Sequence, residues 1–417
     1  MDCLLSQMPI SLGVGFFWKD SPLCLSKLKT DIMMRVIIFV PLLFTFISCS
    51  SQVNNDISQG TIPVDEVEVP IQIDSAEVEI VFCLDATGSM GGLISTAKEK
   101  IWSIVTEVVD DTIPTRIKLG IVFYRDKTDN FVTKVIPLTG DLDYVYNQLL
   151  NIQAQGGGDT PESLNQGLYE AVIKNDWSTN DNVYKTIFVI GDCPPHMDYK
   201  NEVQYTESCK MARKKGIIIN SIKLGPECED ATTHFKNMAS CAGGAYLHLS
   251  QNAKDQIITT PYDNKINELS KSIDDSKIYY GTKQEKRAAN KKKEMEMSFY
   301  TKASSTANNA RVNYKLKHAS KKDWMGNKEL LEDYENGSVN LDSIQVSVLP
   351  KIYRSMTTEE VKQDLSVKSK KRKKLIDDLL KWNKERAKFI NNEKKNSEGE
   401  ESFSTQIGEV MKSQKKK

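Results

Sequence analysis

Apolar residues in the middle third of the chain alternate between short dense runs and runs with a helical period. Residues 78–84 and 184–190 are short and rich in apolar side chains, which is typical of strands covered on both faces. Residues 91–110 instead gather their apolar side chains on one broad face of a helix. The same reading predicts strands at 117–124, 131–138, 216–224 and 245–249, and helices at 141–152, 162–174, 202–215 and 231–242. Strands separated by helices predict an α/β fold with a doubly wound, mostly parallel sheet flanked by helices, which we place at 76–255.

The last third of the chain has a different pattern. Residues 256–310 are rich in Lys, Asn, Ser and Ala, so we expect a linker there, with an ill-defined helix as the alternative. Residues 311–396 predict a small module with a long or paired amphipathic helix that opens on a capping box at 357–360. Residues 397–417 predict a disordered tail. The whole C-terminal region is therefore expected to be basic and largely helical.

An apolar run near the N-terminus predicts export. Residues 36–47 follow Arg35 and are too few to span a bilayer, which takes about 20 residues, but they fit the core of a signal peptide. The run ends Phe46-Ile47-Ser48-Cys49, which resembles the lipobox of bacterial lipoproteins and implies acyl chains on Cys49. The alternative is a plain cleaved signal with a chance cysteine.

The signal-peptide and lipobox patterns divide the first 75 residues into two segments and predict where in the cell the protein lies. We expect an N-terminal extension with a lipoprotein signal peptide at 1–48 and a polar tether at 49–75. A lipid anchor at Cys49 would place the protein in the cell envelope, on a bacterial membrane. We expect the outer membrane or cell surface rather than the cytoplasmic membrane.

Charge is balanced overall but divided along the chain. There are 56 basic and 56 acidic side chains, of which residues 281–417 hold 32 basic and 20 acidic. An acidic body with a basic C-terminal region excludes a uniformly basic nucleic-acid binder, and we expect no nucleic-acid partner. A mean hydropathy of −0.43 excludes a multi-pass membrane protein.

Cysteine usage agrees only loosely with export. Five cysteines follow Cys49, so at least one stays unpaired within the chain. Cys83 lies in an apolar strand and is expected to be a buried thiol. Cys228 and Cys241 flank a predicted helix, where either a disulfide or free thiols fit the spacing. No Cys/His spacing of the zinc type occurs.

Oxygen-bearing side chains follow three of the predicted strands and helices. The first group lies in the segment 85–89, the second in 156–162, and the third begins at Asp192. Because ligands bind at the carboxyl ends of parallel strands, these loops are expected to converge. Carboxylates and hydroxyls suit a hard divalent cation such as Mg²⁺. The alternative is that these residues only cap turns, which Asp, Ser and Gly favour.

This combination of loops resembles the von Willebrand factor type A family, in the variety found in many bacterial members. Asp85, Thr87 and Ser89 match its DxSxS signature, with Thr for the first Ser, and Asp192 matches its third element. In the second element the candidates are, in order, Asp159, Thr160 and Glu162, as parts of Gly-Gly-Gly-Asp-Thr-Pro-Glu. The Tyr-Arg-Asp stretch at 124–126 also resembles the bacterial branch.

The resemblance implies a metal-ion-dependent adhesion site. In the family, protein oxygens hold Mg²⁺, with Mn²⁺ or Ca²⁺ as alternatives, and an Asp or Glu carboxylate of a protein partner completes the coordination. It implies a metal set of Asp85, Thr87, Ser89, Asp159, Thr160 and Asp192.

The leading hypothesis is an exported, membrane-anchored protein that binds a partner through this site. A metal-independent scaffold of an envelope complex is the alternative. An enzyme of the cell envelope is less well supported, because the chain has no GxSxG, GxxxxGK[ST] or GxGxxG motif, and His318 is the only histidine in 281–417. We therefore expect no enzymatic activity. His196, close to Asp192, is expected to be a loop histidine with a solvated ring, and a position at the rim of the site is the alternative.

Overall fold

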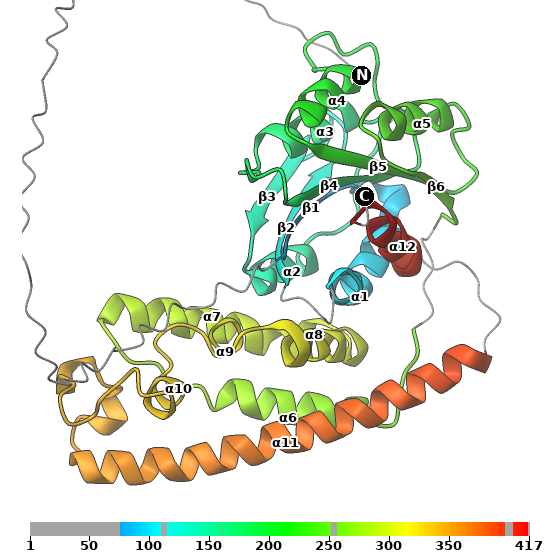
Figure 1. Cartoon of the computed structure of the whole chain (residues 1–417). Helices are drawn as coiled ribbons and strands as arrows, with labels where there is room; N and C mark the ends of the chain where they lie inside the picture. Colours follow the sequence, from blue (N-terminus) through cyan, green and yellow to red (C-terminus); the bar gives the residue numbers. More distant parts are fainter. Residues whose placement is uncertain (1–75, 110–114, 159, 252–256, 397–402, 416–417) are drawn as a thin grey trace, which may run out of the picture. The chain divides into compact units, whose positions relative to one another are not determined.

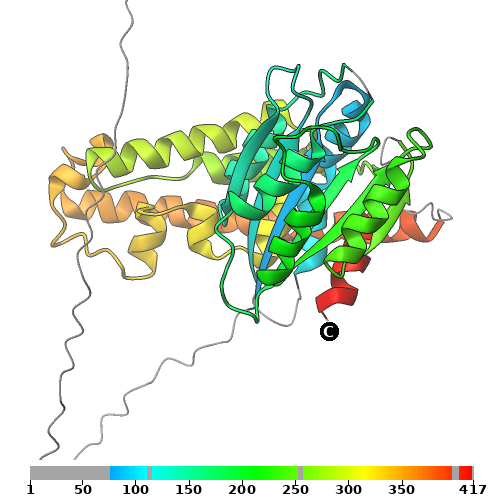
Figure 2. The same ribbon diagram turned by 90° about the horizontal axis from the view of Figure 1, so that it is seen from above.

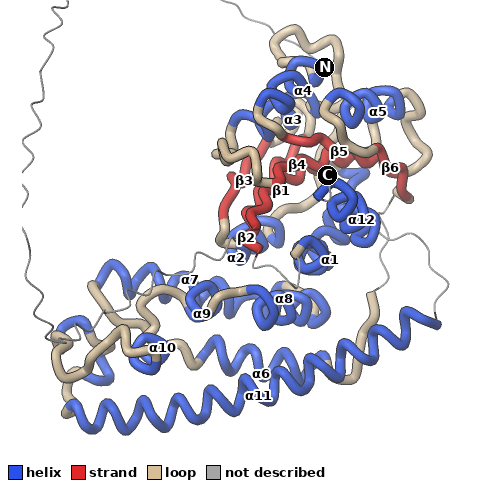
Figure 3. Tube along the Cα trace, viewed as in Figure 1, coloured by secondary structure: helices blue, strands red, loops and turns tan. Residues whose placement is uncertain are grey.

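A six-stranded sheet with strand order β3-β2-β1-β4-β5-β6 forms the centre of the fold (Figures 1 and 3). The computed structural model describes residues 76–109, 115–158, 160–251, 257–396 and 403–415, so the predicted signal peptide, Cys49 and the tether lie outside the described residues. All strand pairs are parallel except β2–β3. The strands are β1 (Ala76–Asp85), β2 (Thr115–Tyr124), β3 (Thr133–Thr139), β4 (Tyr184–Gly191), β5 (Ile217–Leu224) and β6 (Tyr246–Leu249). The prediction of an α/β fold with a doubly wound, mostly parallel sheet is confirmed.

Helices cover both faces of this sheet (Figure 2). Alternation along β1 sends Ile80 and Phe82 to one face and Val81 and Cys83 to the other. The first face packs against α1 (Gly91–Val108) and α2 (Leu142–Leu150), and the second against α3 (Leu164–Ile173), α4 (Tyr205–Lys214) and α5 (Ala231–Cys241). Double coverage explains why the strands read as dense apolar runs.

The C-terminal segment joins this core, so the prediction of a disordered tail at 397–417 was wrong for most of its length. Residues 403–415 form α12 (Phe403–Lys415), which packs against α1. Its buried Phe403, Ile407 and Met411 recur at helical spacing. The Tyr184 hydroxyl of β4 donates a hydrogen bond to Gln414 at 2.6 Å. The sheet layers therefore use a segment far beyond the predicted domain end at residue 255.

Most of residues 257–310 form helices, so the predicted linker was wrong and the helical alternative describes the segment better. The helices are α6 (Asp263–Asp275), α7 (Lys283–Lys302) and α8 (Ser305–His318), with α7 and α8 capped by Thr282 and Ser304. The chain continues through α9 (Lys321–Met325), α10 (Leu330–Glu335), short 3₁₀ turns at Val346–Val348 and Lys351–Tyr353, and the 39-residue α11 (Thr358–Asn396). α11 is the predicted long amphipathic helix. Within the described part of the chain, no helix is both long and apolar enough to span a lipid bilayer.

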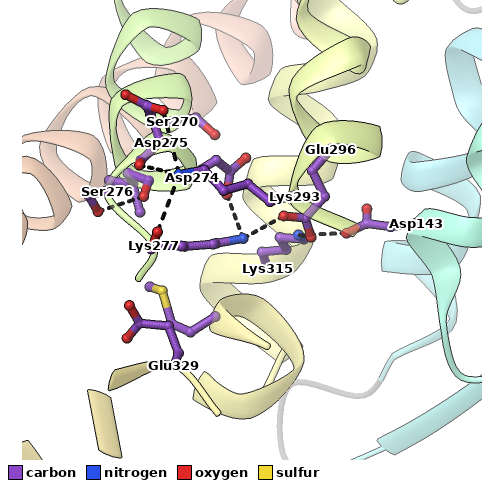
Figure 4. A network of polar contacts seen from close by, with 12 residues as sticks. Asp143, Ser270, Asp274, Asp275, Ser276, Lys277, Lys293, Glu296, Lys315 and Glu329 are labelled. Atoms are coloured by element: carbon purple, nitrogen blue, oxygen red, sulfur yellow. Dashed lines mark hydrogen bonds and ion pairs between the residues drawn. The ribbon is translucent and has the colours of Figure 1, made fainter. Parts of the chain in front are cut away.

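A buried network of charges links these helices to α2 of the sheet domain (Figure 4). Arg311 of α8 donates to both carboxylate oxygens of Asp143, at 2.6 and 3.0 Å, and Lys315 donates to the same carboxylate at 2.7 Å. Lys277 contacts Glu296 of α7 at 2.6 Å. Burial alone would raise the pKa of Asp143, but Arg311 and Lys315 hold it well below its usual range. Removing one partner would leave a buried charge uncompensated, which is strongly destabilising.

Two disulfides tie loops and helices together. Cys193 pairs with Cys228 and Cys209 pairs with Cys241. The possible disulfide between Cys228 and Cys241 is therefore not formed, because Cys228 is bonded to Cys193 and Cys241 to Cys209. Cys83 is the free cysteine among the described residues and is buried, which confirms the expected buried thiol.

Candidate functional site

The first loop of the candidate site is organised by Asp85, the last residue of β1. Its Oδ1 accepts hydrogen bonds from the Thr87 backbone N–H at 2.8 Å and from the Thr87 hydroxyl at 2.6 Å. This is a local turn of the kind that Asp favours. The Thr87 and Ser89 hydroxyl oxygens lie 3.3 Å apart. Asp85 and Thr87 are buried, whereas Ser89 is exposed. The turn thus places three oxygen-bearing side chains just before α1.

The glycine segment at 156–158 packs directly on this turn. The Gly88 N–H donates to the Gly156 carbonyl at 3.0 Å, and the Gly157 N–H donates to Asp129 Oδ2 at 3.1 Å. Gly156 and Gly157 have φ of 87° and 85°, in the left-handed region that favours glycine. A Cβ on Gly157 would lie 3.3 Å from Thr87 Cβ and 3.4 Å from Glu162 Oε1. The absence of a side chain at 157 therefore lets Thr87 and Glu162 approach each other.

Glu162 is the buried acid of the second loop. Its backbone N–H donates to the Pro194 carbonyl and its carbonyl accepts from the His196 N–H, both at 3.0 Å. These two bonds pair the second loop with the loop after β4. Thr160 is exposed, and Asp159 lies outside the described residues. Of the two candidates in this loop that the structure describes, Glu162 is buried and Thr160 is exposed.

Asp192 follows β4 and is buried beside the end of β1. A Cβ on Gly191 would lie only 3.3 Å from Asp85 Oδ2, which shows how closely β4 approaches that carboxylate. Asp192 Oδ2 accepts a hydrogen bond from Gln251 Nε2 at 2.9 Å. Sequence reasoning missed Gln251, because a glutamine 59 residues away carries no local signal of this contact.

The site concentrates negative charge with little compensation. Burial, and then the Asp192 carboxylate, raise the pKa of Asp85 to about 7, although the bonds from Thr87 and the charge of Arg125 act in the opposite direction. Burial also raises the pKa of Glu162 to about 9, with contributions from neighbouring carboxylates led by Asp85. Asp85 Oδ2 and Glu162 Oε2 are buried and make no hydrogen bond to a described residue.

These features fit a divalent cation. Two buried carboxylate oxygens without partners beside two hydroxyls form a set of hard oxygen donors of the type that Mg²⁺ or Ca²⁺ prefers. Among the residues that the structure describes, no three His, Cys, Asp or Glu side chains form a group that could hold a metal by themselves. A cation here would therefore depend on Thr87 and Ser89 as well as on the acids.

Arg125 holds the first two loops in place. Its Nε donates to the Ala86 carbonyl at 3.0 Å and its Nη2 to the Gln153 carbonyl at 2.6 Å, while its guanidinium lies 4.2 Å from the centre of the Phe131 ring. The Arg125 side chain thus bridges the turn after β1 and the segment that leads to the glycines.

His196 is buried, which corrects the expectation of a solvated ring. It stacks on Tyr199 with ring centres 3.8 Å apart, and its Nδ1 lies 2.8 Å from Asp198 Oδ1. The Tyr199 hydroxyl donates to Asp126, whose Oδ1 also accepts from Ser163. Pairing of the second loop with the loop after β4 covers the ring, so its burial depends on tertiary contacts.

A comparison with known families finds a match over the part of the chain that carries this site. Residues 79–261 match the family described as von Willebrand factor A domain. A protein of Acanthamoeba polyphaga mimivirus described as ariadne-like, with a RING finger, is 26% identical over 205 residues, which are 45% of this chain and 19% of that protein. The chain therefore spans about a fifth of the length of this curated relative.

Solved structures that are similar to part of this chain have lower sequence identity. Proximal thread matrix protein 1 from the mussel byssus has a TM-score of 0.32 at 16% identity, covering 43% of each chain. The same mussel protein has been solved with zinc in its metal-ion-dependent adhesion site, and that structure has a TM-score of 0.31 at 15% identity, covering 43% of this chain and 42% of that one. BatB from Bacteroides thetaiotaomicron has a TM-score of 0.30 at 19% identity, covering 42% of this chain and 91% of its own.

Proposed function

We propose that this protein binds a protein partner through a divalent-metal site whose coordination a partner carboxylate completes. The proposal is supported by the match of residues 79–261 to the von Willebrand factor A domain family. The carrying observation is the pair of buried carboxylate oxygens, on Asp85 and Glu162, that lack partners among the described residues. A bound cation would keep one coordination position open, and the carboxylate of the partner protein would bind the cation there. Mg²⁺ is the proposed ion, with Mn²⁺ or Ca²⁺ as alternatives.

Each side chain has a role in this proposal. Asp85 and Asp192 supply carboxylate oxygens, and Thr87 and Ser89 supply hydroxyl oxygens. From the second loop we propose Glu162, supported by its burial, in preference to the exposed Thr160. Arg125 and Gln251 position the loops and the Asp192 carboxylate through the bonds described above. The proposal includes no enzymatic step.

Export and membrane anchoring through Cys49 belong to the same proposal, with the protein in the cell envelope. The two disulfides support it, because disulfides form and persist in oxidising compartments. Acylation of Cys49 is tested by metabolic labelling with a fatty acid. A label that persists on the Cys49→Ala chain would contradict the proposed anchor.

Metal binding by the full chain tests the site. Isothermal titration with Mg²⁺ and Mn²⁺ is expected to give saturable binding that Asp85→Asn and Asp192→Ala abolish. Glu162→Gln is expected to weaken binding, whereas the matched change Thr160→Val at an exposed position of the same loop leaves it unchanged. The reverse order of these two effects would assign the second loop to Thr160.

A partner-binding experiment distinguishes metal-dependent adhesion from a metal-independent scaffold. Proteins captured from an envelope fraction in Mg²⁺ are expected to be lost when a chelator is added and when Asp85→Asn is used as bait. Capture that survives both changes would contradict the metal-dependent function and favour a metal-independent scaffold.

A further inference from the structure

The long helix α11 has two different faces. Leu365, Arg372, Leu379 and Arg386 recur every seven residues and are buried. This is the spacing of a helix that packs lengthwise on a neighbour, and α11 does pack along α6 (Figure 1). The opposite face of the helix is exposed over the same length.

The two arginines of α11 are held in ion pairs on the packed face. Arg372 contacts both carboxylate oxygens of Glu329, at 2.9 and 3.0 Å. Arg386 Nε donates to Asp263 Oδ1 at 2.8 Å. Both arginines are buried in ion pairs within the fold, so the positive charge on the exposed face of α11 comes from lysine side chains.

Five lysines form a continuous stripe on the exposed face. At 100° per residue they occupy an arc of about 100°, and at 1.5 Å per residue they extend over about 21 Å. None of them makes an ion pair with a described residue. This lysine stripe consists of Lys370, Lys373, Lys374, Lys381 and Lys384.

The surroundings of the lysine stripe leave it positively charged. Asp377 is an exposed acid between Lys374 and Lys381, and Glu385 is paired with Lys388 at 2.7 Å. Two apolar side chains border the stripe, Val367 at 62% and Leu380 at 48% exposure. The exposed face therefore combines lysines that form no ion pair with two exposed apolar side chains. One of these lysines, Lys381, also lies 5.2 Å from the centre of the Trp382 ring.

We propose that the lysine stripe binds the anionic headgroup surface of a lipid bilayer, with α11 lying along that surface. Lysine ammonium groups are strongly hydrated point charges on flexible stems, which suits a diffuse anionic surface. The bordering Val367 and Leu380 can enter the headgroup region, as apolar side chains of surface helices do. This contact would be additional to the acyl chains proposed at Cys49 and independent of the metal site.

The exposed face is less suited to nucleic acid. Arginine is the preferred residue for phosphate and base recognition, and both arginines of α11 are buried in ion pairs. The aromatic Trp382 and Phe389 pack against Tyr262, with ring centres at 5.8 and 6.4 Å, so they are occupied within the fold. Duplex DNA therefore serves as the competing ligand in the test.

Vesicle binding tests the proposal on the full chain with Cys49→Ala, so that no acyl chain contributes. Large vesicles of neutral phosphatidylcholine are compared with vesicles containing one third phosphatidylglycerol, by sedimentation at low and high salt. The chain is expected to bind only the anionic vesicles, and binding should weaken as salt screens the charges. The stripe variant changes all five lysines to Gln.

The size of the loss follows from the electrostatics of a bilayer surface. Each lysine near an anionic surface changes the partition coefficient by roughly fivefold. Losing five should therefore lower binding by on the order of 1,000-fold. The substitutions lie at exposed positions, so circular dichroism and the unfolding midpoint should stay unchanged.

A matched control removes the same charge elsewhere. Five exposed lysines without a described ion pair lie on other elements. Changing them to Gln removes the same charge but leaves the exposed face of α11 intact, so vesicle binding should stay within about twofold. They are Lys134, Lys214, Lys271, Lys283 and Lys291.

Three results would overturn the proposal. One is equal binding by the stripe variant and the parent chain. Another is equal binding to neutral and anionic vesicles. The third is displacement of the chain from anionic vesicles by duplex DNA at equal phosphate concentration, which would assign the stripe to nucleic acid instead.

Discussion

Asp85 and Glu162 hold their carboxylates in a buried, negatively charged environment. The pKa values of about 7 and about 9 arise first from burial and then from neighbouring carboxylates. In the unfolded chain the carboxyl pKa values are about 4. The folded state therefore binds these protons more tightly than the unfolded state.

This difference predicts how stability depends on pH. Raising the pH from about 4 to about 9 removes protons that the folded state prefers, so the metal-free chain loses stability over that range, by on the order of 4 kcal/mol for Asp85 alone. Urea unfolding at pH 5 and pH 8 measures the change. Mg²⁺ is expected to restore stability at pH 8, and Asp85→Asn should flatten the dependence. Equal slopes for Asp85→Asn and the parent chain would contradict this account.

Gly191 is a second residue whose identity matters to the site. A Cβ there would lie 2.3 Å from the Tyr124 hydroxyl, which donates to the Ile190 carbonyl at 3.2 Å. Gly191→Ala is expected to destabilise the chain by about 1–3 kcal/mol and to displace the end of β4. Chemical denaturation measures this. Gly91→Ala is the control, because a Cβ at Gly91 meets no atom within 4 Å. A Gly191→Ala chain as stable as the control would show that Tyr124 moves freely.

At the scale of elements, the disulfides bring distant segments together around the second face of the sheet. Cys209 of α4 and Cys241 of α5 are 32 residues apart, and Cys193 after β4 and Cys228 after β5 are 35 apart. Both bonds thus fix the helices and loops that follow adjacent strands.

Removing the α4–α5 bond should lower stability. Cys209→Ala with Cys241→Ala is expected to reduce the free energy of unfolding by roughly 3–4 kcal/mol, from the loop-closure entropy of about 32 residues. The measurement is urea unfolding, without and with a reductant. The reductant should destabilise the parent chain but have no effect on a chain that also lacks the Cys193–Cys228 bond. A parent chain insensitive to reductant would argue against both bonds.

At the scale of the molecule, the N-terminal and C-terminal parts of the described chain share one core. α12 contributes Phe403, Ile407, Val410 and Met411 to the cluster that contains Phe188 and Ile222 of the sheet. The helices between β6 and α12 are therefore inserted within the sheet domain, because α12 packs back on the core of that domain.

Deletion of residues 397–417 should consequently uncover the sheet face. Losing four buried apolar side chains at about 1.5 kcal/mol each predicts a destabilisation of roughly 6 kcal/mol. Thermal unfolding and binding of a hydrophobic dye measure the effect. Lys412→Ala removes only the exposed ion pair with Glu107 and should cost less than about 1 kcal/mol. A deletion as mild as Lys412→Ala would show that α12 is not part of the core.

Local pattern was sufficient for the strands, the main helices and the loops of the site. Dense apolar runs and helical periods report burial directly, because the side chains on one face of an element recur with the period of that element. The same holds for the Asp85–Thr87 turn, whose hydrogen bonds connect residues two positions apart. The site residues inferred from these loops remain predictions until metal binding is measured.

Contacts between distant residues were decided only by the tertiary structure. The burial of Glu162 rather than Thr160, the bond from Gln251 to Asp192 and the disulfide partners each join segments that the sequence does not relate. The predicted linker failed for a related reason. Glu296, inside the predicted linker, looks like a solvated charge until Lys277 and Lys315 are placed against it, at 2.6 and 3.3 Å. Periodicity records which side chains avoid water, whereas the pairing of charges and sulfurs depends on how the folded chain brings them together.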